Sequence, residues 1–229
     1  MSLISVLCLD MAGTTVRDGS SVMTAFTAAI AGESLPVREF NAAMKYVNAT
    51  MGQSKIEVFR HILGDEAAAQ RANASFEGHY AKSVADGLIT AMPGAEHLFA
   101  TARDAGIRVC LSTGFSPVTR DAIIAALGWA GRVDLLLSPA DAGRGRPWPD
   151  MPLTALLRLG GGSVHELAVA GDTPSDIEAG LRAGAGIVAG VLTGDSPRAD
   201  LVAVPAATGL SGTPLILDSV TGLLPHLGL

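Results

Sequence analysis

The stretch Leu7-Cys8-Leu9-Asp10-Met11-Ala12-Gly13-Thr14-Thr15 decides the fold. An apolar run precedes Asp10, and a short continuous run of this kind predicts a strand buried in a parallel sheet (Leu3, Ile4, Val6, Leu7, Cys8 and Leu9). The run ends on the carboxylate and then breaks into a Gly-Thr-Thr turn. Ligands of open α/β sheets bind outside the carboxyl ends of the strands, so Asp10 stands where chemistry would occur. Taken alone, the same carboxylate could equally cap a turn.

Polar residues follow three further predicted strands. Ser112-Thr113-Gly114 follows the apolar run 107–111, and Gly171-Asp172-Thr173-Pro174-Ser175-Asp176 follows the run 166–170. A glycine- and arginine-rich loop containing Arg146 comes after the run 133–137. The strand ends therefore present a carboxylate, a hydroxyl, a guanidinium and a carboxylate pair. This set fits phosphoryl transfer with Mg²⁺, although the carboxylate pair also suits the first turn of a helix.

Length and composition bound the function. The 229 residues allow one large domain or a core with a small inserted domain, and the 48% hydrophobic content suffices for a sizeable core. The net charge of −6 and the lack of a basic block argue against nucleic-acid binding. No apolar run reaches the roughly 18 residues of a membrane span, and the N-terminus lacks the basic region of a signal peptide. Cys8 and Cys110 fall in predicted core strands and are expected to stay reduced, which favours a cytoplasmic protein.

The hydrophobic pattern predicts two kinds of structure. Between about residues 20 and 89 the pattern is helical, with helices expected at 22–31, 37–51, 54–63 and 66–84. From Pro93 onward strands alternate with helices, and strands are expected at 108–111, 133–137, 167–170, 187–191 and 215–217. The predicted fold class is therefore α/β, with a doubly wound parallel sheet and an inserted helical unit. We expect a core formed by residues 1–17 and 92–229 and a helical insertion at 18–91.

These motifs, in this order, resemble those of the haloacid dehalogenase superfamily. Three stretches narrow the resemblance to phosphonoacetaldehyde hydrolase (phosphonatase) and phosphonatase-like hydrolases: residues 10–15 (Asp-Met-Ala-Gly-Thr-Thr), 51–56 (Met-Gly-Gln-Ser-Lys-Ile) and 145–151 (Gly-Arg-Pro-Trp-Pro-Asp-Met). The resemblance implies a Rossmann-like core and a helical cap that closes over the site, with hinges near residues 16–20 and 88–93. It also implies a homodimer formed through the cap.

The resemblance assigns roles around the nucleophile and the metal. Asp10 is the candidate nucleophile, which would attack phosphorus to form an aspartyl-phosphate. Asp10, Asp172 and the backbone carbonyl of Ala12 would hold Mg²⁺, and Asp176 would support the metal indirectly. Phosphoryl oxygens would be bound by Thr113 and clamped by Arg146. The remaining residues expected to contact substrate or phosphate are Ala12, Gly13, Met51, Gly52 and Gly114.

Ala12 is the main departure from an ordinary phosphatase of this superfamily. Phosphatases carry a second aspartate two residues after the nucleophile, where it protonates the departing alkoxide. A methyl group cannot do so, and a phosphate monoester would leave poorly here unless another group supplied the proton. A substrate with a different leaving group is therefore expected.

Lys55 suggests what this different leaving group could be. The chain has three lysines, all in the helical insertion, and the pattern Ser54-x-x-Glu57 predicts a capping box that places Lys55 in the first turn of a helix. The positive end of the helix dipole disfavours an ammonium there, and a neutral amine is what imine formation requires. The resemblance implies that Lys55 condenses with the aldehyde of phosphonoacetaldehyde, so that the carbon–phosphorus bond can break with an enamine as leaving group. A solvated surface lysine is the competing interpretation.

The chain also departs from the phosphonatases. A histidine three residues after the lysine is Val58 here, a cysteine near the first hinge is Ser20, and a tyrosine after Thr113-Gly114 is Phe115. The proton transfers of imine formation are therefore unassigned, with His61 as one candidate. Three alternatives stay open: a Mg²⁺-dependent phosphatase acting on a small phosphomonoester, a metal-independent dehalogenase, and a non-catalytic binding protein. The expected ligand is in any case a small anionic phosphonate or phosphate.

Overall fold

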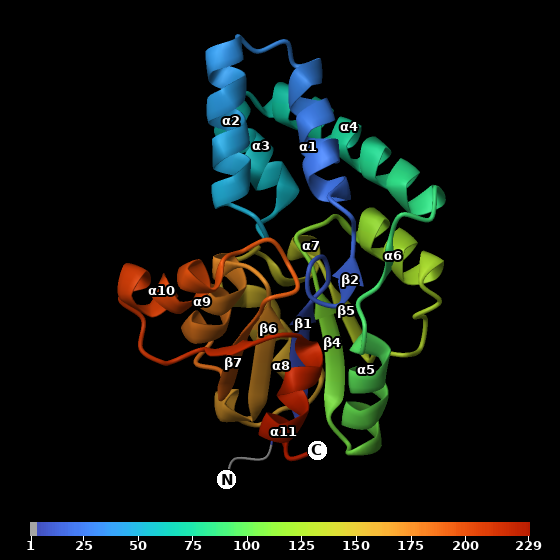
Figure 1. Ribbon diagram of the computed structural model, residues 1–229, viewed down its shortest axis with the longest axis vertical. Coiled ribbons are helices and arrows are strands. Elements are labelled where there is room, and N and C mark those ends of the chain that lie inside the picture. Colours follow the sequence, from blue (N-terminus) through green and yellow to red (C-terminus); the bar gives the residue numbers. More distant parts are fainter. Residues whose placement is uncertain (1–3) are drawn as a thin grey trace.

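The computed structural model describes residues 4–229. Its centre is a six-stranded parallel sheet with the strand order β5-β4-β1-β6-β7-β8 (Figure 1). β1 (Val6–Asp10) lies at the centre between β4 (Arg108–Ser112) and β6 (Leu167–Gly171), and all five of its residues are buried. β5 (Leu135–Leu137), β7 (Ile187–Val191) and β8 (Leu215–Leu217) complete the sheet. The predicted α/β fold class and all the predicted strands are confirmed, except that β5 begins two residues later than expected. Leu3, the first residue of the expected apolar run, lies outside the described residues.

Helices cover both faces of the sheet, because parallel strands must be buried on both sides. On one face, Leu7 and Leu9 of β1 belong to a core cluster that includes side chains of α5 (Ala95–Asp104). On the other face, Val6 and Cys8 pack with α8 (Asp150–Arg158). The other helices of the core are α6 (Pro117–Ala126), α7 (Pro139–Ala142), α9 (Pro174–Arg182), α10 (Arg198–Thr208) and α11 (Leu224–Leu227), with 3₁₀ turns at Val164–Glu166 and Val220–Leu223.

Four helices lie together at one end of the molecule, beyond the sheet (Figure 1). They are α1 (Ser21–Gly32), α2 (Val37–Ala49), α3 (Lys55–Leu63) and α4 (Glu66–Ala85), and we call residues 21–85 the helical segment. The chain enters it through β2 (Val16–Arg17) and returns through β3 (Thr90–Ala91), which pair antiparallel. The predicted boundaries at 17/18 and 91/92 fall at the ends of these two strands. The division into two domains itself stays a prediction.

An aromatic cluster fills the helical segment and extends into the core. Phe26 and Phe76 lie 4.7 Å apart between ring centroids, and Phe59 packs against both. Phe115, which follows β4 in the core, lies 4.5 Å from the ring of Tyr80 on α4. The helical segment and the sheet therefore share one apolar core on this side.

The predicted capping box of α3 is wrong. α3 begins at Lys55 as expected, but the Ser54 side chain makes no cap hydrogen bond. Glu57 instead binds Arg60 at 2.5 Å, one turn along the helix. The guanidinium of Arg60 also binds Glu66, and its charge draws the Glu57 carboxylate away from the helix start.

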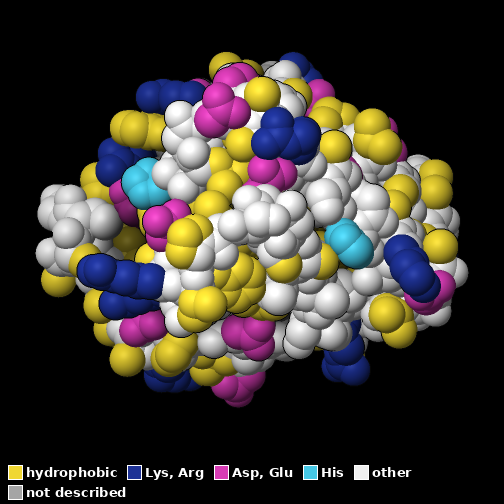
Figure 2. All heavy atoms as spheres, turned by 90° about the horizontal axis from the view of Figure 1, so that it is seen from above, with side chains coloured by type: hydrophobic (Ala, Val, Ile, Leu, Met, Phe, Trp, Pro, Cys, Tyr) yellow, Lys and Arg dark blue, Asp and Glu magenta, His cyan; other side chains and the backbone are white. Residues whose placement is uncertain are grey.

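The end of the molecule that carries the helical segment has a mixed surface. Seen from that side, lysine and arginine side chains lie scattered among acidic and apolar ones (Figure 2). Within residues 4–229, no helix combines the length and apolar character that a bilayer crossing requires.

Candidate active site

A pocket of about 610 Å³ lies where the carboxyl ends of the strands meet the helical segment. Its walls come from the turn after β1, the loop between α2 and α3, and the loops after β4, β6 and β7. The structure brings together in it every residue predicted for the site except Asp176, which lies just behind the wall: Asp10, Ala12, Gly13, Met51, Gly52, Lys55, Thr113, Gly114, Arg146 and Asp172.

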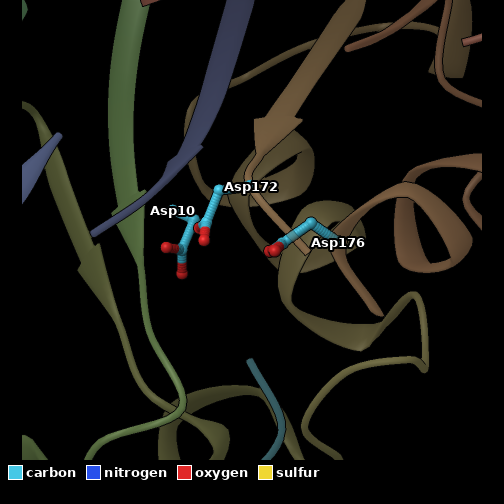
Figure 3. Close-up of side chains that lie close together, drawn as sticks. All are labelled: Asp10, Asp172 and Asp176. Atoms are coloured by element: carbon cyan, nitrogen blue, oxygen red, sulfur yellow. The ribbon is translucent and has the colours of Figure 1, made fainter. Parts of the chain in front are cut away.

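Three buried carboxylates meet beside this pocket (Figure 3). Asp10 ends β1, Asp172 follows β6, and Asp176 lies in the first turn of α9; one oxygen of each lies within 4.8 Å of the others. Burial raises the pKa of Asp10 to about 7, and burial together with the nearby Asp10 charge raises the pKa of Asp172 well above its usual range. Such an excess of buried negative charge, made of hard oxygen atoms, suits a divalent cation such as Mg²⁺.

Arg146 connects these carboxylates to the rest of the site. The side chain is 3% exposed, and its Nε and Nη1 bind Asp176 and Asp10 at 2.8 and 2.6 Å. Nη1 also donates to the carbonyl of Gly52 at 3.1 Å, and Nη2 donates to the carbonyl and hydroxyl oxygens of Ser112 at 2.9 and 2.8 Å. All five N–H groups of the guanidinium therefore have acceptors. A phosphoryl oxygen that bound Arg146 would have to replace one of them.

Neighbouring threonines hold the acidic residues in place. Thr14 donates to Asp172 Oδ1 at 3.0 Å, and Thr173 forms a capping box with Asp176 at the start of α9. Asp176 thus caps its helix, as one interpretation of this carboxylate predicted, and also binds Arg146. Thr193, after β7, donates to the carbonyl of Gly13 at 2.7 Å. Sequence reasoning assigned no role to Thr14 or Thr193, although both lie where the strand-end rule would direct attention.

The loop between α2 and α3 docks directly on the core. Gly52 has φ +84°, and a Cβ there would lie 2.5 Å from Thr173 Oγ1. Gly114 contacts the carbonyl of Gln53 so closely that it has no room for a side chain, and the Gly114 carbonyl accepts a hydrogen bond from the Lys55 N–H at 3.3 Å. Where the helical segment and the core meet, Gly114 lets backbone approach backbone, and Gly52 lets backbone approach the Thr173 side chain. Thr113, beside them, is 2% exposed and lines the pocket.

Lys55 is a buried residue of the pocket rather than a surface lysine. It is 6% exposed, and its Nζ lies 5.1 Å from the ring centroid of Phe115 and 5.7 Å from that of Phe26. The amine donates one hydrogen bond, to the carbonyl of Gln53 at 3.4 Å. Burial lowers the pKa of Lys55 to about 8, against partial compensation by the Asp10 charge. At neutral pH an appreciable fraction of the amine is therefore unprotonated.

Of the three residues at which the chain departs from the phosphonatases, two line the pocket and one does not. Ser20 and Phe115 line the pocket, whereas Val58 is buried inside the helical segment. His61 is exposed and stacks on Tyr46 with ring centroids 3.9 Å apart, outside this pocket. The candidate role of His61 in imine formation is therefore wrong.

Comparisons with known proteins point to one hydrolase family. A family model for haloacid dehalogenase-like hydrolases matches residues 4–184. A phosphonoacetaldehyde hydrolase of Parabacteroides distasonis is 28% identical over 214 residues, which are 86% of this chain and 79% of that protein. One from Bacillus cereus is 30% identical over 115 residues, 50% of this chain but only 43% of its own length. The probable phosphatase IndB of Dickeya dadantii is 27% identical over 203 residues, 85% of each protein.

Solved structures share the whole fold. A hydrolase from Pseudomonas syringae superposes with a TM-score of 0.80 over 98% of both chains at 22% identity, a likeness of fold alone. A phosphonoacetaldehyde hydrolase-like protein from Oleispira antarctica has a TM-score of 0.79 over 99% of this chain and 92% of its own, at 26% identity. The relatives thus agree on the fold and include both a phosphonate hydrolase and a phosphatase.

Proposed function

We propose that this chain, which belongs to the haloacid dehalogenase-like hydrolase family, is a magnesium-dependent hydrolase that cleaves the carbon–phosphorus bond of phosphonoacetaldehyde or a related oxo-phosphonate. The observation that carries the proposal is the buried amine of Lys55 in the same pocket as the carboxylate of Asp10. A lysine with a lowered pKa in an apolar surrounding is suited to imine formation. Hydrolysis of a phosphate monoester requires no imine.

Mg²⁺ would be held by Asp10, Asp172 and the carbonyl of Ala12, with Asp176 fixed behind them by Arg146. When bound, the ion supplies Lewis-acid stabilisation of the negative charge on phosphoryl oxygens. Arg146 and the three carboxylates sum to a net charge of −2 when all are ionised, which a divalent cation would neutralise. Thr113 and the N–H of Gly114 would orient the phosphoryl group for in-line attack.

The proposed reaction has three stages on this chain's own residues. The Lys55 amine first condenses with the substrate aldehyde, releases water and leaves an iminium that can accept an electron pair. Asp10 then attacks phosphorus, the carbon–phosphorus bond breaks, and its electron pair moves into the iminium to give an enamine. Hydrolysis of the aspartyl-phosphate and of the enamine releases phosphate and acetaldehyde. Ala12 is compatible with this scheme, because no alkoxide leaves.

A phosphatase acting on a small phosphomonoester is the second candidate. It is favoured by the similarity to the probable phosphatase of Dickeya dadantii, which covers as much of this chain as the phosphonatase match does. The pocket volume of about 610 Å³ also leaves room for substrates larger than a two-carbon phosphonate. Against it stands Ala12, which offers no proton to a leaving alkoxide.

The test is a side-by-side assay of phosphate release from phosphonoacetaldehyde and from common phosphomonoesters, with Mg²⁺ and with EDTA. We expect metal-dependent release from the phosphonate, and sodium borohydride with substrate should trap an adduct on Lys55 and inactivate the enzyme. Lys55→Arg should keep the positive charge and lose the activity. Rapid turnover of phosphomonoesters with none of the phosphonate would establish the second candidate instead.

A further inference from the structure

Imine formation on Lys55 needs a group that moves protons to and from oxygen. When an amine adds to an aldehyde, the resulting carbinolamine must lose its hydroxyl as water, and that hydroxyl needs a proton. The residues that would supply it in the resembled family are replaced here by Val58, Ser20 and Phe115, whose side chains do not titrate. The need for a replacement rests on the proposed function.

Asp18 lies in the same pocket as Lys55, between the end of β2 and the start of α1. Its carboxylate is partly buried, and Oδ2 accepts a hydrogen bond from the N–H of Val22 at 3.2 Å. Among residues 4–229, no side chain donates a hydrogen bond to either oxygen of Asp18. One oxygen is therefore anchored to the first turn of α1, while no side chain occupies the other.

The charges around Asp18 favour a carboxyl group that can hold a proton. Burial raises the pKa of Asp18, and the nearby carboxylate of Asp195, in the loop after β7, raises it further. The hydrogen bond from the Val22 N–H opposes this rise, and the charge of Lys55 on α3 opposes it more weakly. The Asp18 charge in turn raises the pKa of Lys55. Tyr80 of α4 also lies within range of the Asp18 charge. Asp18 and Lys55 line the same pocket, so a charge on either group acts on the other.

We propose that Asp18 is the proton donor and acceptor for the imine on Lys55. In the forward direction the protonated carboxyl gives its proton to the carbinolamine hydroxyl, the carbon–oxygen bond breaks, and water and the iminium form beside the Asp18 carboxylate. After turnover the terminal carbon of the enamine takes a proton from solvent water and the iminium re-forms. Water then attacks the iminium carbon, and the Asp18 carboxylate takes one proton from that water to give the carbinolamine. Asp18 thus recovers in this direction the proton that it gives up in the forward direction.

If Asp18 served only to hold the first turn of α1 through the Val22 N–H, its replacement by Asn would leave the rate of imine formation unchanged. Asp18→Asn keeps an oxygen that can accept from the Val22 N–H but removes the transferable proton. Asp65→Asn is the matched control: Asp65 caps α4 by accepting from the Ala68 N–H at 2.8 Å, is exposed, and lies outside the pocket.

The experiment follows imine formation by rapid mixing with phosphonoacetaldehyde, quenching with sodium borohydride, and mass analysis of the peptide that contains Lys55. We expect Asp18→Asn to slow adduct formation by about 10²-fold with an unchanged Tm, and Asp65→Asn to match the wild type. Equal rates in Asp18→Asn and the wild type would overturn the role of Asp18 and leave the proposed function standing. Absence of any adduct in the wild type would overturn both.

Discussion

The carbonyl oxygen of Gly52 accepts a hydrogen bond from Arg146 Nη1 at 3.1 Å, and the same nitrogen binds Asp10 at 2.6 Å. A backbone group of the helical segment thus contacts the guanidinium that positions the candidate nucleophile. Placement of the loop between α2 and α3 and placement of the Asp10 carboxylate are therefore coupled through one side chain.

Gly52→Ala is expected to impair turnover more than stability. The substitution puts a methyl group 2.5 Å from Thr173 Oγ1 and at φ +84°, so the loop must withdraw from the core. Gly64→Ala is the control, because Gly64 has φ +64° and a Cβ added there would meet no atom within 4 Å. This variant should lose only the roughly 1 kcal/mol of unfolding free energy that an alanine at positive φ costs. Measurements of kcat and of urea unfolding on both variants separate the two effects. Equal kcat values for the two would show that the Gly52–Thr173 contact has no part in catalysis.

Arg146→Lys should lose activity and destabilise the fold by about 2 kcal/mol or more, because an ammonium cannot replace five N–H donors held in a plane. Asp10, Asp176 and Ser112 would be left with unsatisfied buried oxygens. Arg144→Lys is the matched substitution in the same loop: Arg144 is exposed and binds Asp150 at 2.9 Å. Its unfolding free energy and kcat should stay close to those of the wild type. A fully active Arg146→Lys variant would contradict the assigned role.

Lys55→Met should stabilise the metal-free protein while removing the amine. The pKa of Lys55 falls from 10.5 to about 8 on burial, so below pH 8 the folded state carries a buried ammonium at a cost of about 3 kcal/mol. Between pH 8 and 10.5 the folded state is neutral and the unfolded state still protonated, so wild-type stability rises with pH. The gain from Lys55→Met should therefore be largest below pH 8 and fade towards pH 10.5.

Chemical unfolding between pH 6 and pH 10 in EDTA measures this gain. Lys45→Met is the control, because Lys45 is an exposed residue of α2. A gain in stability that stayed constant over this range would show that the ammonium of Lys55 is not penalised by burial.

Ala12→Asp should shift the substrate preference towards phosphomonoesters. Ala12 lines the pocket two residues after Asp10, and a carboxyl group there would protonate a leaving alkoxide. We expect kcat/KM for a small phosphomonoester to rise by about 10²-fold, with no rise for the phosphonate, whose leaving group is carbon. Assays of both substrates on wild type and variant check this, and an unchanged ratio would show that a missing acid does not set the preference.

The sequence predicts the sheet and most of the site because both depend on local patterns. Buried strands such as β1 are continuous apolar runs, and their carboxyl ends carry Asp10, Thr113 and Asp172, which parallel topology brings together. The sequence does not predict contacts that depend on where the helical segment docks. The close approach of Gly114 to Gln53 and the aromatic surroundings of Lys55 join residues about 60 positions apart in the chain.

The errors also have physical causes. Glu57 follows a regular capping pattern, but a nearby guanidinium outcompetes the backbone N–H for its carboxylate. His61 is exposed and stacks on Tyr46 instead of reaching the pocket. Asp18 belongs to no recognised sequence motif. Only its position in the pocket distinguishes it from the other acidic residues.

The two connections between sheet and helical segment are hydrogen-bonded to each other. Val16 pairs with Ala91, Arg17 pairs with Thr90, and the Met92 N–H donates to the carbonyl of Thr15 at 2.8 Å. Because the two connections are paired, a displacement of one carries the other with it, and both ends of the helical segment move together.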